Sequence, residues 1–201
     1  MQTHVRTLLE IAGRRIQPAR LQDSAVVLVD AQLEYVTGRL PLDGIDRALD
    51  AVAALLARAR ATGAPIIHIL QDGRPGGLFD RGGPFFAAAP QAEALPGEPI
   101  LLKPRPNAFS GTDLDFTLRS LGRRDLVLAG FMTHMCISAT ARAALDAGYR
   151  TTLVAAATAT RDLPAGDGSG VVSAAAVQCA TLAALADRFV AVIADGAALE
   201  I

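Results

Sequence analysis

The sequence of 201 residues lacks several features that define whole classes of protein. It has no tryptophan and only two cysteines, Cys136 and Cys179, which are too few for a disulfide scaffold and predict a reducing compartment, the cytoplasm. Its net charge of −1 argues against a nucleic-acid binder, which normally carries a basic surface. No apolar run is long enough to span a membrane, and the N-terminus has no apolar segment typical of a secretory signal. We therefore expect neither a nucleic-acid nor a membrane partner.

Lysine is nearly absent as well. Lys103 is the only lysine beside 18 arginines, and it ends an apolar run over residues 99–103. Arginine is a planar, permanently charged fork, whereas lysine is a compact charge that responds to its surroundings. One lysine at a strand end therefore indicates a site that needs a small cation beside a reacting group. The alternative is a drift in composition that left a single lysine without a function.

Short apolar segments are abundant, and they alternate with longer amphipathic ones. This alternation predicts an α/β protein, a three-layer doubly wound sandwich with a six-stranded parallel sheet. We expect one domain over residues 22–201, preceded by an N-terminal arm over residues 1–21 that carries a short helix within 7–16. The predicted strands cover residues 25–30, 65–70, 99–103, 125–130, 151–156 and 189–193, the predicted helices cover 44–62, 113–121, 136–147 and 171–186, and a long loop covers 71–98.

Three reactive side chains fall at the predicted carboxyl ends of strands, where ligands bind in sheets of this kind. Asp30 ends the first strand, Lys103 ends the third, and Cys136 follows the fourth after a short turn. Cysteine attacks as a thiolate, and both the N-terminus of the next helix and Lys103 are expected to lower its pKa. Asp30 could then accept the thiol proton. The three residues together predict covalent catalysis with an acid–base partner.

These residues also have structural interpretations. Cys136 could be a small buried apolar residue, as we expect for Cys179 on the apolar face of the last helix. Asp30 could cap a turn. His134, two residues before Cys136, is a second candidate base, or else a pocket wall or a turn residue, and His68 is interpreted as a hydrogen-bonded strand histidine.

A nucleotide-binding domain would share this architecture. Its phosphate loop, G-x-G-x-x-G, should follow the first strand, but the chain has DAQLE over residues 30–34. The glycine-rich segment over residues 166–170 precedes a helix, and we interpret it as a flexible lid or a helix cap rather than a phosphate site.

The turn over residues 130–136 (GFMTHMC) can direct backbone N–H groups at a developing oxyanion. With the segments 26–32 (VVLVDAQ), 103–109 (KPRPNAF) and 111–114 (GTDL), it resembles the isochorismatase-like cysteine hydrolases, the superfamily of the nicotinamidase-related amidases, over residues 22–195. The resemblance implies a catalytic triad and a homodimer or homotetramer. It implies a cis peptide bond before Met132. The residues that it assigns are Asp30, Lys103 and Cys136 for the triad, and the N–H groups of Met132 and Cys136 for the oxyanion hole.

Departures from the family pattern narrow the chemistry. Nicotinamidases bind a metal through Asp-x-His after the second strand, but residues 70–74 here are LQDGR, so we predict no metal and no cofactor. The cysteine favours hydrolysis of a C–N bond in a small-molecule amide or lactam through a thioester, and streptothricin hydrolase, which opens a lactam, is considered as a relative. A vinyl-ether hydrolase and a non-catalytic oligomeric scaffold are the alternatives. The residues expected to line the substrate pocket are Gln32, Tyr35, Phe79, Asn107, Phe109 and His134.

Overall fold

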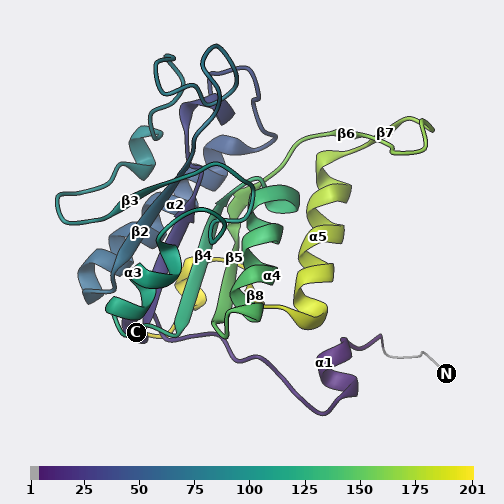
Figure 1. Ribbon diagram of the computed structural model, residues 1–201. Coiled ribbons are helices and arrows are strands. Elements are labelled where there is room, and N and C mark those ends of the chain that lie inside the picture. Colours follow the sequence, from purple (N-terminus) through teal and green to yellow (C-terminus); the bar gives the residue numbers. More distant parts are fainter. Residues whose placement is uncertain (1–4) are drawn as a thin grey trace.

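A computed structural model describes residues 5–201 and contains one six-stranded sheet (Figure 1). All neighbouring strands run parallel, in the order β3-β2-β1-β4-β5-β8. The predicted three-layer α/β architecture is therefore confirmed. The strands are β1 (Ser24–Val29), β2 (Ile66–Gln71), β3 (Ile100–Lys103), β4 (Asp125–Phe131), β5 (Arg150–Ala159) and β8 (Ala191–Ile193).

Helices cover both faces of the sheet, which explains why its central strands are apolar along their whole length. Every residue of β1 is buried, as expected for a parallel strand with no solvent-facing side. One face packs on α2 (Ile45–Thr62), which ends at Gly63 in the left-handed conformation that glycine readily adopts. The other face packs on α3 (Leu114–Ser120), α4 (Ser138–Asp146) and α5 (Ala174–Arg188) (Figure 1).

The order of the strands places a topological switch between β1 and β4. The chain builds outward from β1 through β2 to β3, and then returns to place β4 on the other side of β1. Ligands of doubly wound sheets bind at the carboxyl ends of the strands at such a point. Asp30 follows β1 directly, and Cys136 follows β4, so the switch brings these two residues to the same edge of the sheet.

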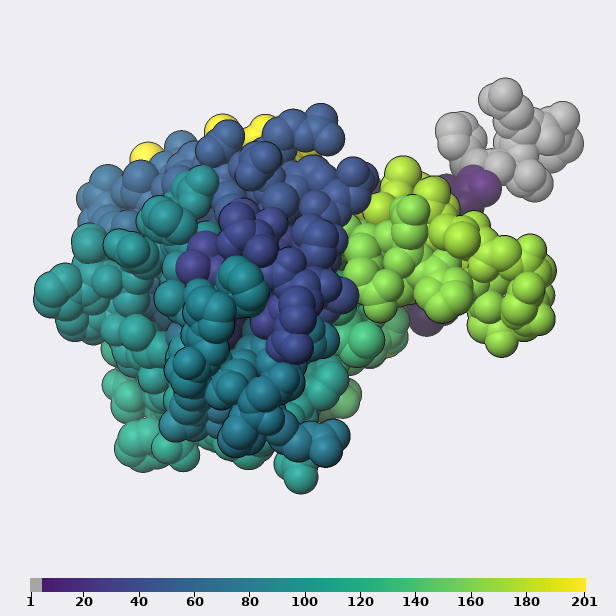
Figure 2. Space-filling view, turned by 90° about the horizontal axis from the view of Figure 1, so that it is seen from above, coloured from purple at the N-terminus to yellow at the C-terminus, as the bar shows by residue number. Residues whose placement is uncertain are grey.

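The segments that follow β1 and β2 are joined beyond this edge of the sheet. The chain after β1 and the chain after β2 are joined by an isolated antiparallel bridge between Gln32 and Ala88 and by backbone hydrogen bonds on either side of it. In the view from above, these purple-blue and teal segments lie side by side (Figure 2). The expected long loop is therefore an ordered cover that contains one 3-10 turn, Pro90–Ala92.

Three local predictions need correction. The helix expected from Cys136 begins at Ser138, because a π-helical turn over Thr133–Ile137 comes first. The helix expected from Val171 begins at Ala174, because β6 (Leu163–Pro164) and β7 (Val171–Val172) form a hairpin that stands out from the body (Figures 1 and 2). Cys179 on α5 is exposed, not buried in an apolar face.

The N-terminal arm contains α1 (Leu8–Ile11), which is shorter than expected and lies against α5. The N–H of Leu8 donates to Asp187 on α5 at 2.7 Å. Leu21 is fully buried in the core beside α2, so the packed body begins there. Residues 1–4 of the predicted arm lie outside the described residues. Within residues 5–201, no helix combines the length and hydropathy needed to cross a bilayer. Placement in the cytoplasm stays a prediction.

Candidate active site

Asp30, Lys103 and Cys136 converge at the carboxyl edge of the sheet, although they are far apart in the sequence. The Lys103 Nζ lies 2.8 Å from the Asp30 Oδ2 and 3.3 Å from the Cys136 Sγ. Asp30 and Lys103 are fully buried, and Cys136 is 4% exposed. A carboxylate, an ammonium and a thiol thus share a small volume from which water is excluded, so their charges act strongly on one another.

Backbone geometry directs these three side chains to one point. Asp30 has a left-handed φ of 52°, which few residues other than glycine, asparagine and aspartate adopt, and its N–H donates to the carbonyl of Ile69 in β2. Lys103 is the last residue of β3 and pairs in register with Gln71. The π-helical turn after β4 carries Cys136. The ends of three parallel strands therefore supply the cluster.

The Asp30 carboxyl is unusually basic for an aspartate. Burial raises its pKa to about 6, and the Lys103 ammonium offsets part of that rise. Although Oδ2 is ion-paired with Lys103 at 2.8 Å, neither carboxylate oxygen receives a well-aligned hydrogen bond from residues 5–201. A buried acceptor without a hydrogen-bond partner carries a cost in free energy, which binding a proton would relieve. Asp30 is thus suited to take up a proton near neutral pH.

The expected lowering of the Cys136 pKa is wrong for this state of the site. Burial, followed by the negative charge of Asp30, raises the pKa of the thiol to about 12, and Lys103 only partly opposes this. The helix N-terminus invoked for the lowering belongs to Ser138 rather than to Cys136. The resting cluster is therefore a neutral thiol beside a carboxylate–ammonium pair.

Lys103 has a third partner that the sequence analysis did not identify. Its Nζ donates to the Oε1 of Gln71 at 2.5 Å. Gln71 ends β2 and lies in the segment 70–74, which is noted above only for its lack of metal ligands. Its position in the sequence could have identified it as a candidate site residue, because it is a polar residue at the carboxyl end of a strand next to the Lys103 strand.

The turn before the cysteine has the geometry that the resemblance implied. The Phe131–Met132 peptide bond is cis. Just before it, Gly130 has a φ of 116°, and a Cβ there would lie 1.9 Å from the carbonyl oxygen of Val29, so only glycine allows β4 to approach β1 this closely. The N–H of Met132 has no acceptor among residues 5–201, as a donor reserved for a ligand requires.

Three of the six expected pocket residues are buried in the structure. Gln32 is fully buried and uses its amide on the backbone of Gln71 and Phe86, a placement that favours support of the site over contact with a substrate. Tyr35 and Phe79 stack edge to face with their ring centroids 5.1 Å apart. Burial, and then the charge of Asp30, raise the pKa of the Tyr35 hydroxyl, so its ring lies near the cluster as a neutral wall.

The other three expected residues are partly exposed. The Asn107 side chain accepts a hydrogen bond from the N–H of Phe109, which closes a tight local turn. Phe109 stacks on Tyr149 with their centroids 5.6 Å apart and packs against the core below α3 and α4. His134 contacts Thr160 through its Nδ1 at 2.6 Å, and its Nε2 has no partner within residues 5–201. Burial lowers its pKa, and none of its hydrogen bonds reaches Cys136.

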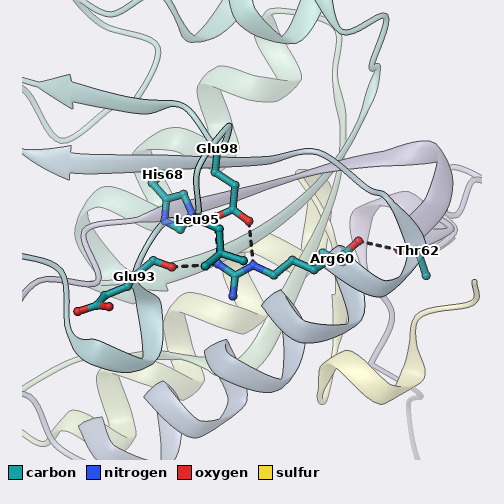
Figure 3. A network of polar contacts seen from close by, with 7 residues as sticks. Arg60, Thr62, His68, Glu93, Leu95 and Glu98 are labelled. Carbon is teal, nitrogen blue, oxygen red and sulfur yellow. Dashed lines mark hydrogen bonds and ion pairs between the residues drawn. The ribbon is translucent and has the colours of Figure 1, made fainter.

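His68 belongs to a separate network on the α2 side of the sheet (Figure 3). Its Nε2 lies 2.8 Å from Glu98, which also forms two bonds with the guanidinium of Arg60 on α2. His68 is therefore a strand residue whose side chain is hydrogen-bonded, as interpreted from the sequence. The network ties the segment before β3 to α2. Among the residues that the structure describes, no three His, Cys, Asp or Glu side chains gather as metal ligands.

Comparison with known proteins agrees with this geometry. Residues 24–194 match the isochorismatase domain model. A crystal structure of an isochorismatase from Pseudomonas putida is 44% identical, has a TM-score of 0.92, and covers 97% of this chain and 99% of that chain. Streptothricin hydrolase of Streptomyces noursei is 36% identical over 122 residues, which are 61% of this chain and 44% of the relative, so the match spans less than two thirds of that protein. Ureidoacrylate amidohydrolase of Azorhizobium caulinodans is 28% identical over 158 residues, with 61% of this chain and 70% of the relative covered. The chain is a member of the isochorismatase family of hydrolases.

Proposed function

We propose that the protein is a cysteine hydrolase that cleaves the C–N bond of a small-molecule amide or lactam through a thioester acyl-enzyme. The observation that carries the proposal is the buried cluster of Asp30, Lys103 and Cys136, which has the three groups that such chemistry needs within contact distance. Relatives named as a hydrolase of streptothricin and as an amidohydrolase support the class of bond.

The first step moves the thiol proton from Cys136 to Asp30. The raised pKa of the carboxyl and the lack of well-aligned hydrogen bonds to its two oxygens favour this transfer. The transfer converts a carboxylate–ammonium pair into a thiolate–ammonium pair, so the net charge of the buried cluster does not change. Because charge is costly to create where water is excluded, this exchange lets a thiol with a raised pKa ionise when a substrate arrives.

The thiolate then attacks the amide carbonyl. The N–H groups of Met132 and Cys136 stabilise the oxyanion that forms, and the unpartnered N–H of Met132 supports this role. The Lys103 Nζ is already hydrogen-bonded to Gln71 and Cys136 and ion-paired with Asp30, so we assign it to the sulfur and the carboxylate rather than to the oxyanion.

Asp30 completes the cycle as an acid and then as a base. It returns its proton to the leaving nitrogen as the tetrahedral intermediate collapses to the thioester. The carboxylate then takes a proton from water, whose oxygen attacks the thioester carbonyl. As the C–S bond breaks and the acid product departs, Asp30 returns this proton to the sulfur, which restores the thiol and the carboxylate. The cycle needs no metal or cofactor.

A panel of small amides and lactams tests the proposal on the Cys179→Ser background, because Cys179 is exposed and would react independently. Released ammonia or amine reports amide cleavage, and a mass gain of one water reports lactam opening. Acid quenching followed by mass spectrometry should find the acyl group on Cys136. Cys136→Ala should abolish both signals. Turnover that survives this change, as vinyl-ether cleavage could, would overturn the proposal, and so would a panel-wide absence of acylation, which a scaffold predicts.

We also propose that the chain forms a homodimer or homotetramer. The support is apolar surface on two projecting segments. Val171 and Val172 on the hairpin are 72% and 39% exposed, and Leu8 and Ile11 on the arm are 50% and 61% exposed. Neighbouring exposed apolar residues on one segment form a contiguous surface, and contiguous apolar surface is a mark of protein–protein contacts. Light scattering in solution measures the assembly directly.

A further inference from the structure

Gln71 is the one partner of the Lys103 ammonium, among the three that the structure gives it, whose side chain cannot ionise. Its Oε1 accepts from Nζ at 2.5 Å, the shortest of the three contacts. The ammonium has three N–H bonds and no exposure to solvent, so each bond needs a protein acceptor. Gln71 and Cys136 supply one hydrogen-bond acceptor each, and Asp30 supplies the ion-pair partner. Without Gln71, one charged N–H bond would be left unpaired in a dry site.

Gln71 is itself held from several sides. The side-chain amide of Gln32 pairs with its backbone as a neighbouring strand would. The Gln71 N–H donates to the Gln32 Oε1 at 2.8 Å, and the Gln32 Nε2 donates to the Gln71 carbonyl at 3.2 Å. At its far end, the Nε2 of Gln71 donates to the carbonyl of Asp72. This contact fixes the orientation of the side-chain amide, so that its oxygen is directed at Lys103.

The neutrality of this acceptor matters for the charge of the cluster. Asp30, Lys103 and the Cys136 thiol sum to zero, and the sum stays zero when the proton moves to Asp30. A carboxylate at position 71 would also hold the ammonium, but it would add a negative charge beside a forming thiolate. An amide holds the cation without that opposition.

We propose that Gln71 is a positioning residue that holds the Lys103 ammonium against the sulfur of Cys136, with Gln32 fixing Gln71 in turn. The proposal rests on the proposed function, because a positioned cation matters only if Cys136 ionises to react. The other ionisable groups near the cluster are Tyr35, and Asp72 at the rim, where two hydrogen bonds pair it with Arg81. Neither of them contacts Nζ among the contacts that the structure gives it.

The test measures the ionisation of Cys136 without any substrate. On the Cys179→Ser background, the rate of Cys136 alkylation by iodoacetamide is followed against pH by mass spectrometry of the peptide, and the midpoint of the profile reports the thiol. Gln71→Leu should raise the midpoint by about one pH unit, which is about tenfold less thiolate at a given pH below it. Gln71→Glu should raise the midpoint further, because it adds charge.

Gln91→Leu is the matched control, since Gln91 is exposed and distant in sequence from the cluster, and its midpoint should not move. Gln71→Met, which keeps the length of the side chain, replaces the leucine variant if that protein melts early. A midpoint unchanged in folded Gln71→Leu or Gln71→Met would overturn the positioning role. An alkylation midpoint of Gln71→Glu equal to that of the parent protein would also overturn it. A shifted midpoint together with an amide panel that shows no acylation would instead sustain Gln71 and refute the hydrolase proposal, so the two failures are distinguishable.

Discussion

Replacing Asp30 with asparagine should make the nucleophile easier to ionise and the enzyme far less active. The carboxylate acts on Cys136 in two opposite ways. Its negative charge raises the pKa of the thiol, second only to burial, and it is also the proposed acceptor of the thiol proton. Asparagine keeps the shape, removes the charge and cannot accept the proton. The thiolate then becomes the sole anion beside the Lys103 ammonium.

The magnitudes follow from the burial of the pair. A charge in contact typically shifts a pKa by about 1–3 units, so the Cys136 alkylation midpoint should fall by at least about one unit. Loss of a general base typically costs about 100-fold to 10,000-fold in rate, so amide turnover should fall by at least about 100-fold. Removing one partner of a buried ion pair costs about 3–5 kcal/mol, and we expect the lower end because the thiolate can replace the carboxylate.

Three measurements check this prediction on the Cys179→Ser background. They are the pH profile of alkylation, the steady-state turnover of the best substrate in the panel, and urea unfolding at neutral pH. Asp72→Asn is the matched control, because Asp72 is a rim carboxylate paired with Arg81, where the loss should be at most about 1 kcal/mol and the midpoint should stay fixed. An alkylation midpoint that stays or rises in Asp30→Asn would refute the coupling between Asp30 and Cys136.

Three further predictions test the surroundings of the site. Gly130→Ala should lose more than about 3 kcal/mol in chemical denaturation or fail to fold, because its φ is unfavourable and its Cβ would meet Val29; wild-type stability would show that β4 can shift away from β1. Burial lowers the pKa of His68, so the stability that neutral His68 contributes is present above about pH 6.5 and is lost as pH falls below it, while Glu98, with a pKa of about 2, stays ionised. His68→Gln should therefore flatten the dependence of unfolding free energy on pH between about 6.5 and 5. The unfolding free energies of the variant and of wild type are compared at each pH, because the titration of Asp30 in the same range changes stability in the opposite direction in both proteins. Val171→Asp should reduce the assembly mass in light scattering without lowering the melting temperature, because the side chain is 72% exposed; an unchanged mass would place the interface elsewhere.

Local sequence patterns predicted the sheet well. Each of the six predicted strands lies within three residues of an observed strand at both ends, because continuous apolar runs bounded by Gly, Pro or polar residues are a local signal. The hairpin over residues 163–172 was missed, because its strands have two residues each and too few apolar positions to show a period. The segment 130–136 was predicted to form a tight turn, but its π-helical form depends on packing against α4 and α5.

The chemistry of the site divides in the same way. Asp30, Lys103 and Cys136 could be chosen from the sequence, since residue type and position at a strand end are both visible there. The direction of the Cys136 pKa shift could not be predicted from the sequence, because burial outweighs the nearby cation and burial arises only when the chain folds around the thiol. Gln71 was overlooked because its role depends on facing Lys103 across two paired strands.

The sequence by itself determined the order of the strands along the chain, the residue types at their ends and hence the family. Tertiary structure alone decided which of those strand ends lie together, how far their side chains are buried from water, and which amide side chain holds the lysine. The physical reason is that apolar period and residue chemistry act over a few residues. Electrostatic energy instead depends on distance and on exclusion of water, and both arise only when the sheet and its cover assemble.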